Sequence, residues 1–246
     1  AELASVNARL AELHTSFAQN VLAEEDESVV LVDAEDRLAG LPGPARHAAA
    51  AEASRRGHAG GWAIPITRTS VEQVLTFADH REFREQVWRM FVGRGDGDGP
   101  TGNRDIVRHI LDLRARRARL LGFPTHAHWR LEDSMARTPE RAIELMEAVW
   151  RPAVARVREE VADMQAIADA EGAGIRIEPW DYRFYAEKVR KAKHDLDEGE
   201  IIPYLQLEKL REGMFFTAGE LFGLRFAPVD PRSVPVYHPE IGRAHV

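Results

Sequence analysis

Residues 138–174 have the sequence TPERAIELMEAVWRPAVARVREEVADMQAIADAEGAG, which predicts one long amphipathic helix. Thr138 can cap the first turn with its hydroxyl, and Pro139 suits that turn because it has no N–H to leave unpaired. Pro152 predicts a kink further on, and Gly172 predicts the end of the helix. One face carries apolar residues at spacings of three and four: Ile143, Met146, Trp150, Val154, Val157, Val161 and Met164.

Helical patterns also precede and follow this stretch. A first helix is predicted by an apolar stripe of Leu3, Val6, Leu10, Leu13, Phe17 and Val21. A last helix with a buried face is predicted by Leu207, Leu210, Met214, Ala218 and Leu221. Between them we expect helices within 38–57, 81–91, 104–121 and 179–195.

Two segments have the β-branched residues and neighbouring turn formers that are typical of strands. They are SVVLVD (28–33) and GWAIPITRT (61–69). Ser70 follows, with Gln73 three residues later, and this capping-box pattern predicts a helix that begins there. The sequence therefore predicts a mainly α fold, a multi-helix array with a minor β-hairpin-like element.

Composition argues against several classes of protein. The net charge of −7 disfavours a general nucleic-acid binder. Cysteine is absent, so neither a disulfide framework nor a cysteine-ligated metal is expected, and a cytoplasmic location fits. No apolar run approaches the roughly 18 residues of a membrane span, so we expect no membrane partner.

Histidines and acids give two candidates for a metal site. His126 and His128 could supply two ligands, but residues two apart on a helix point to different sides, and no third ligand is placed. A second candidate is the turn KHDLDEGE, which lacks the EF-hand spacing and contains His194, Asp195, Asp197, Glu198 and Glu200. For the two histidines, a packing or surface role is favoured over metal binding. For the acidic turn, a solvated surface is favoured over a cation site. HREFRE, from His80, lacks the second histidine of HExxH.

Two further stretches could contact a ligand. Segment 104–121 could bind phosphate through its arginines. The interleaved leucines and the acidic net charge of the chain instead favour ion pairs between these arginines and neighbouring acids. The arginines are Arg108, Arg114, Arg116, Arg117 and Arg119. Segment 178–195 could form either a ligand-contacting surface or the packed start of a helix with its aromatic residues Trp180, Tyr182, Phe184 and Tyr185.

Long segments of the chain also share the pattern of a known family. Residues 178–226 are EPWDYRFYAEKVRKAKHDLDEGEIIPYLQLEKLREGMFFTAGELFGLRF. This stretch resembles a hallmark of the thimet-oligopeptidase-like zinc metallopeptidases, and most of all their bacterial peptidyl-dipeptidase branch. Four more segments match in order: LASVNARLAELHTSFAQNVL, LTFADHREFREQVWRMFVGRG, ILDLRARRARLLGFPTHAHWRLEDSMARTPE and VPVYHP. The resemblance covers residues 1–239.

The resemblance implies a helical, two-lobed shell around a deep channel. The family holds one zinc ion with the two histidines of HExxH and a downstream glutamate, and the glutamate of the motif activates the zinc-bound water. The peptidyl-dipeptidase branch releases dipeptides from the C-terminus of short peptides. The narrow channel excludes folded proteins.

The present sequence departs from the family because it contains no HExxH, a motif that follows the VYHP segment in relatives. We therefore transfer no catalytic residue, substrate-binding residue or metal ligand. Residues 1–239 are expected to be an incomplete helical region upstream of the zinc motif, inactive alone and without bound zinc. The expected partners are short peptides, for the full-length enzyme, and the missing C-terminal catalytic half.

The last residues have a separate explanation. Residues 241–246, IGRAHV, are one translation of ATC GGA AGA GCA CAC GTC, which is part of a widely used sequencing-library adapter. We expect this segment to be an adapter-encoded artefact.

Two other functions stay open from the sequence. One is a non-catalytic helical module that binds peptides or proteins. The other is a nucleic-acid-binding helical protein that uses the arginine-rich segment 104–121, which the negative net charge disfavours.

Overall fold

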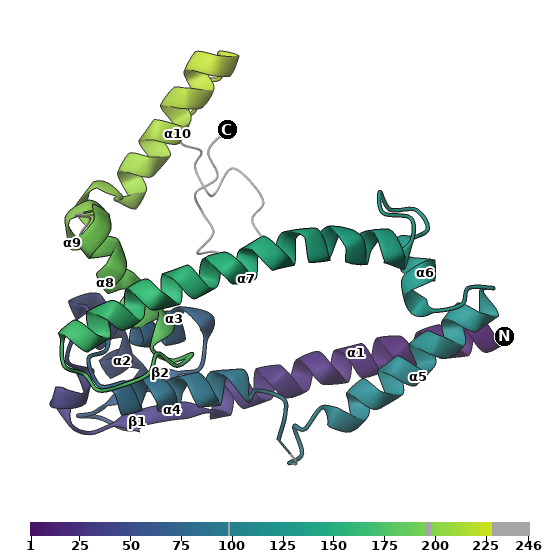
Figure 1. The fold of residues 1–246 in the computed structure, drawn as a ribbon, viewed down its shortest axis with the longest axis horizontal. Coiled ribbons are helices and arrows are strands. Elements are labelled where there is room, and N and C mark those ends of the chain that lie inside the picture. Colours follow the sequence, from purple (N-terminus) through teal and green to yellow (C-terminus); the bar gives the residue numbers. More distant parts are fainter. Residues whose placement is uncertain (98, 195–197, 228–246) are drawn as a thin grey trace. The chain divides into compact units, whose positions relative to one another are not determined.

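The computed structural model describes residues 1–97, 99–194 and 198–227 (Figure 1). The chain divides into two units, Ala1–Arg190 and Lys191–Val246. Across the described residues the fold is mainly α with one antiparallel pair of strands, so the predicted fold class is confirmed. No helix in this part of the chain is both long and apolar enough to cross a membrane.

The elements follow one another in a simple order. The first unit begins with α1 (Glu2–Glu27), β1 (Val29–Val32), the 3-10 helix η1 (Glu35–Leu38), α2 (Gly43–Arg55), β2 (Trp62–Pro65), α3 (Arg68–Phe77) and α4 (Arg81–Val92). It continues with α5 (Arg104–Leu120), α6 (His126–Leu131), α7 (Pro139–Ala170) and most of α8 (Tyr182–His194). The second unit contains α9 (Glu198–Ile201), η2 (Ile202–Tyr204) and α10 (Leu207–Phe222).

A compact lobe forms around the two strands, which pair with Val30 opposite Ile64. α2 and α3 contact β2, and α4 contacts α3. We call residues 29–92 together with Trp180 the hairpin lobe. Its core contains the buried side chains of Val30, Val32, Leu38, Ile64, Ile66, Val71, Val74, Phe83, Val87 and Trp180. The predicted hairpin-like element is therefore the centre of a packed core.

The boundary between β2 and α3 differs from the prediction. Thr67, and not Ser70, is the N-cap of α3, and its hydroxyl accepts a hydrogen bond from the backbone N–H of Ser70 at 3.5 Å. Ile66 is buried in the core, and Thr67 adopts extended backbone angles directly after it. Since the chain turns into the helix immediately after this core residue, the strand is shorter and the helix longer than the pattern suggested.

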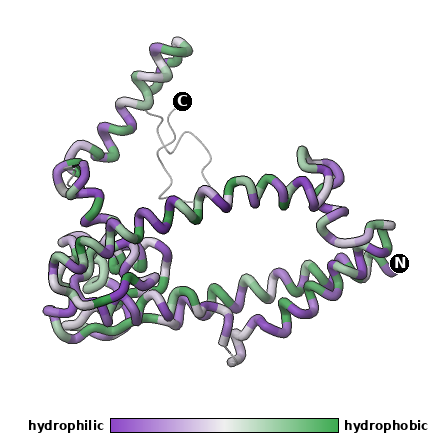
Figure 2. The backbone as a smooth tube through the Cα atoms, viewed as in Figure 1, coloured by the Kyte–Doolittle hydropathy of each residue, from purple (hydrophilic) through white to green (hydrophobic). Residues whose placement is uncertain are grey.

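α1 and α5 lie side by side, and apolar and polar residues alternate along both helices (Figures 1 and 2). Their contact buries Val6, Leu10, Leu13 and Ile110, with Ile106 and Leu113 packed at the edge. The predicted stripe of the first helix is thus confirmed at its centre, whereas Phe17 is exposed.

α7 behaves differently along its length. Thr138 caps it by accepting a hydrogen bond from the backbone N–H of Arg141 at 3.4 Å, and the helix continues through Pro152. Near its end, Met164 and Ala168 pack against Tyr185 of α8. Its first half exposes large apolar side chains to solvent, namely Ile143, Leu145, Met146, Val149 and Trp150. Of the predicted apolar stripe, only Met164 is fully buried.

α10 also confirms the predicted helix but not the predicted burial. It ends at Gly223, whose φ of 65° is a left-handed conformation that glycine adopts readily. Its apolar side chains are exposed, including Leu207, Leu210, Met214, Phe216, Leu221 and Phe222. The prediction of a buried stripe was therefore wrong for this helix as described. The segments VPVYHP (234–239) and IGRAHV (241–246) lie outside the described residues.

Candidate functional sites

The aromatic residues at the start of α8 belong to the core. Trp180 and Tyr185 are buried, and the rings of Trp180 and Trp88 lie 5.5 Å apart, edge to face. The hydroxyl of Tyr182 donates to Glu160 at 3.1 Å, and burial together with this hydrogen bond raises the pKa of Tyr182. Of the two alternatives for this segment, the packed start of a helix is the one that the structure shows.

Asp181 joins the start of α8 to the start of α4. Its carboxylate is fully buried and accepts hydrogen bonds from Arg81 Nη2 at 2.8 Å and Arg84 Nη2 at 2.9 Å. Arg84 is itself buried, and its Nη1 donates to the backbone oxygen of Ala78 at 2.7 Å. The hydrogen bond with Asp181 raises the pKa of Arg81. These groups fix two helices and leave no carboxylate lone pair directed at solvent, so they form a structural network.

Sequence reasoning missed this network. HREFRE was considered only as a failed zinc motif. Arg81 and Arg84, however, are three residues apart at the start of α4. Residues three apart share a helix face, which was the available signal. Nothing in the spacing, however, pairs that face with a carboxylate 97 residues away.

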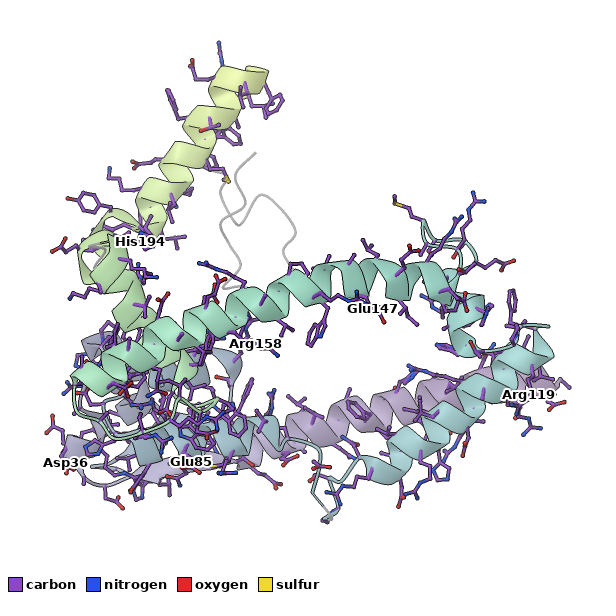
Figure 3. All side chains as sticks on the ribbon, in the orientation of Figure 1. Asp36, Glu85, Arg119, Glu147, Arg158 and His194 are labelled. Atoms are coloured by element: carbon purple, nitrogen blue, oxygen red, sulfur yellow. The ribbon has the colours of Figure 1, made fainter. Side chains whose placement is uncertain are left out.

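The arginines of α5 that the sequence singled out lie in three kinds of environment. Arg108 pairs with Asp105 at 2.8 Å and Arg116 pairs with Glu2 at 2.5 Å, as expected for an outer face lined by acids. Arg119 is exposed near the end of the helix (Figure 3). Arg114 and Arg117 instead lie near groups that are not carboxylates, at 3.3 Å from His14 Nε2 and 3.3 Å from Asn7 Oδ1. The expectation of acid pairing is confirmed only for Arg108 and Arg116.

The two histidines of α6 do not converge on a common point. His128 Nδ1 lies 2.8 Å from the hydroxyl of Thr125, and its Nε2 lies 4.0 Å from Glu140. His126 packs its ring 5.6 Å from the ring of Trp129, and its Nδ1 is buried without a hydrogen bond. Two imidazoles with separate environments do not form a chelating pair.

No group of three histidine, aspartate or glutamate side chains among the described residues could hold a metal ion. In the turn 194–200, Asp195 and Asp197 lie outside the described residues, and Glu198 and Glu200 belong to α9. The described residues therefore offer no donor set that fits the zinc ion implied by the family resemblance.

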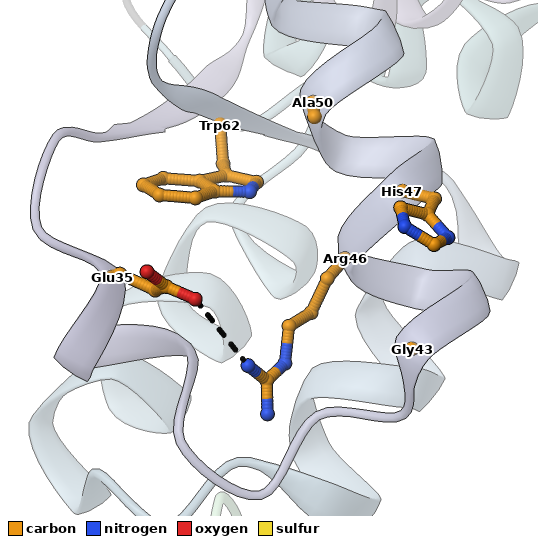
Figure 4. A pocket seen from close by; sticks show the side chains of 6 residues that line it. All are labelled: Glu35, Gly43, Arg46, His47, Ala50 and Trp62. Atoms are coloured by element: carbon orange, nitrogen blue, oxygen red, sulfur yellow. Dashed lines mark ion pairs between the residues drawn. The ribbon is translucent and has the colours of Figure 1, made fainter.

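One cavity of about 350 Å³ opens on the hairpin lobe between η1, α2 and β2. It is lined by Glu35, Gly43, Arg46, His47, Ala50 and Trp62 (Figure 4). Arg46 Nη1 lies 3.7 Å from Glu35, and Arg46 Nε donates to the backbone oxygen of Leu41 at 3.0 Å. The charges in the cavity thus largely satisfy each other, and its remaining feature is the indole of Trp62.

Comparison with known proteins places the chain in a family. The pattern of peptidase family M3 matches residues 74–246. The chain belongs to this family, which confirms the resemblance of the sequence to metallopeptidases.

Individual relatives extend the match over almost the whole chain. The dipeptidyl carboxypeptidase of Escherichia coli (strain K12) is 36% identical over 242 residues, which cover 98% of this chain and 35% of that protein. The dipeptidyl carboxypeptidase of Salmonella typhimurium is 37% identical over 243 residues, again 98% and 35%. Oligopeptidase A of Escherichia coli (strain K12) is 29% identical over 237 residues, 95% and 34%. The chain therefore spans about a third of the length of the relatives it matches.

Proposed function

We propose that this chain is part of the helical framework of a zinc-dependent metallopeptidase that cleaves short peptides by releasing C-terminal dipeptides. The observation that carries the proposal is the 36% identity with a dipeptidyl carboxypeptidase over 98% of the chain. The oligopeptidase A relative of the same organism matches at 29%, so the dipeptide-releasing type is the better supported of the two. A cytoplasmic role in peptide catabolism is part of the proposal.

In this proposal the zinc ion and the catalytic groups belong to residues outside these 246. The matched region is about a third of each relative, so most of a complete peptidase of this kind lies beyond it. This chain contributes scaffold, and a catalytic half completes the active site. The exposed apolar face on the first half of α7 supports this division, since large uncovered apolar surfaces usually mark contacts with another surface.

A second candidate is a helical module that binds peptides without cleaving them. The same exposed face of α7 favours it, because an amphipathic helix can present its apolar side to a peptide. The two candidates differ in whether activity appears when the remaining part of a peptidase is supplied.

A chimera tests the proposal. The region of the Escherichia coli dipeptidyl carboxypeptidase that aligns with this chain is replaced by residues 1–239, and dipeptide release from a blocked short peptide is measured. We expect activity that a chelator abolishes and added zinc restores. Residues 1–239 alone, and the enzyme with the region deleted, serve as controls and should release nothing.

A chimera that is folded by circular dichroism and monodisperse on gel filtration, yet inactive, contradicts the proposal. Saturable peptide binding by the isolated chain, together with an inactive chimera, supports the binding module instead.

A further inference from the structure

Cationic side chains gather around one indole ring where α5 meets α6. The ring of Trp129 has the guanidinium carbon of Arg117 4.4 Å from its centroid, that of Arg130 at 5.5 Å and the ring of His126 at 5.6 Å. Arg114 lies one turn before Arg117 on α5 and acts electrostatically on His126. We call Arg114, Arg117, His126, Trp129 and Arg130 the arginine corner.

The arginine corner has no negative side chain of its own. Among residues 1–97, 99–194 and 198–227, no carboxylate forms an ion pair with Arg114, Arg117 or Arg130. Glu140, further along the chain, lies by His128 instead, at 4.0 Å. Two other arginines of α5, Arg108 and Arg116, both reach acids.

Several polar atoms of the arginine corner are buried without a hydrogen-bond partner, which lowers the stability of the fold. The Nε atoms of Arg114 and Arg117 and the Nδ1 atom of His126 are buried without a hydrogen bond. Burial, followed by the charges of Arg114 and Arg130, lowers the pKa of Arg117. Burial, followed by the charge of Arg114, lowers the pKa of His126 as well. Partly buried charges of one sign destabilise a fold unless an opposite charge offsets them.

We propose that the arginine corner binds a small oxyanion of the phosphate class, either free phosphate or a phosphomonoester. Guanidinium groups recognise such anions with paired N–H donors, and the outer nitrogens of Arg130 are on an exposed residue. A dianion offsets more of the corner's three guanidinium charges than a single carboxylate does. The net charge of −7 repels long polyanions, so a small ligand fits better than a nucleic acid. This site is independent of the proposed peptidase activity.

The test uses the whole chain and inorganic phosphate. Isothermal titration calorimetry at constant ionic strength should show saturable binding to the wild type. Arg117→Gln should weaken that binding by about tenfold or more, because one charge-assisted contact is lost. Arg116→Gln is the matched control on the same helix, where the arginine already pairs with Glu2, and it should bind phosphate like the wild type.

Two further arms define the ligand. Phosphoserine that binds as tightly as phosphate identifies a corner open to esterified phosphate, whereas weaker binding identifies free phosphate as the ligand. Acetate should bind at least about tenfold more weakly than phosphate, because it carries one charge and two oxygens.

Arg130→Gln keeps the test decisive where Arg117→Gln does not fold, because Arg130 is exposed and its loss leaves the core intact. Phosphate should raise the melting temperature of the wild type and of Arg116→Gln, and should raise that of Arg130→Gln less. Absence of saturable binding by the wild type overturns the proposal. So does equal affinity of the wild type, Arg130→Gln and any folded Arg117→Gln protein.

Discussion

The hairpin lobe and the first half of α7 are both amphipathic in sequence, yet they differ in how their apolar side chains end up. In the lobe, Phe83 and Val87 are completely buried under neighbouring elements. On α7, Met146 and Trp150 remain 60% and 69% exposed. Helical periodicity therefore identifies the apolar face of an element. Whether that face is buried depends on a packing partner, which the sequence pattern does not identify.

Charges show the same contrast. Asp181, which precedes α8, pairs with both Arg81 and Arg84 of the hairpin lobe, and all three groups are enclosed or partly enclosed by protein. Arg81 and Arg84 share a buried carboxylate, whereas Arg114 and Arg117 of the arginine corner have none among the described residues.

Removing the buried carboxylate of Asp181 should have a large effect on stability. Asp181→Ala leaves the guanidinium of Arg84, which is only 2% exposed, without its charge partner. We expect a loss of about 3–5 kcal/mol in the free energy of unfolding, measured by urea denaturation. Glu12→Ala is the control, since its pair with Arg9 is exposed and should contribute at most about 1 kcal/mol. Equal effects of the two substitutions contradict the idea of a completed buried network.

Substitutions of the two helix caps should have effects of intermediate size on stability. Thr67 caps α3 in the lobe and Thr138 caps α7, each through one hydroxyl hydrogen bond. Thr67→Ala should lower the global free energy of unfolding by about 1 kcal/mol. Thr138→Ala should instead speed amide hydrogen exchange in the first turns of α7 by roughly fivefold, because that end has few tertiary contacts and opens locally. A full loss of global stability in Thr138→Ala shows that the first half of α7 is part of the cooperative core.

A smaller, pH-dependent effect is expected at Glu52. Hydrogen bonds from Arg55 and Arg56 lower the pKa of Glu52 from 4.5 to about 2. A lowered folded-state pKa means that the stabilisation is present above the unfolded value and is lost as the pH falls through the folded value. The stability difference between wild type and Glu52→Gln should therefore be constant above about pH 5 and vanish near pH 2. A difference that persists at the acidic end contradicts this assignment, and a salt titration at neutral pH checks that the pair is electrostatic.

The sequence predicted the elements well because they depend on local chemistry. The cap at Thr138 and the stripe Val6, Leu10 and Leu13 were recognised from spacing alone, and both occur. Ser70 failed as a cap because Ile66, four residues earlier, packs into the core and makes the chain turn sooner. That decision is tertiary, and no local pattern contains it.

The candidate sites were harder to predict for the same reason. His126 and His128 are two residues apart in the sequence, but their surroundings differ. His126 lies near arginines of α5, whereas His128 lies near Glu140. The arginines of 104–121 form one basic stripe in the sequence. In the described part of the structure, Arg108 and Arg116 pair with acids, whereas Arg114 and Arg117 do not. Arg108 pairs with Asp105 of its own helix, whereas the pairing of Arg116 with Glu2 depends on how α1 packs against α5.

Substitutions of two tryptophans test directly whether the hairpin lobe and the first half of α7 differ in burial. Trp180 is 9% exposed in the hairpin lobe, and Trp150 is 69% exposed on α7. Trp150→Ala should change the free energy of unfolding by no more than about 0.5 kcal/mol, as exposed substitutions usually do. Trp180→Ala, its matched control, should cost about 3–5 kcal/mol. If Trp150→Ala is as destabilising as Trp180→Ala, then the first half of α7 has a partner within this chain. Its apolar face is then no longer an uncovered surface, and its support for a missing catalytic half is lost.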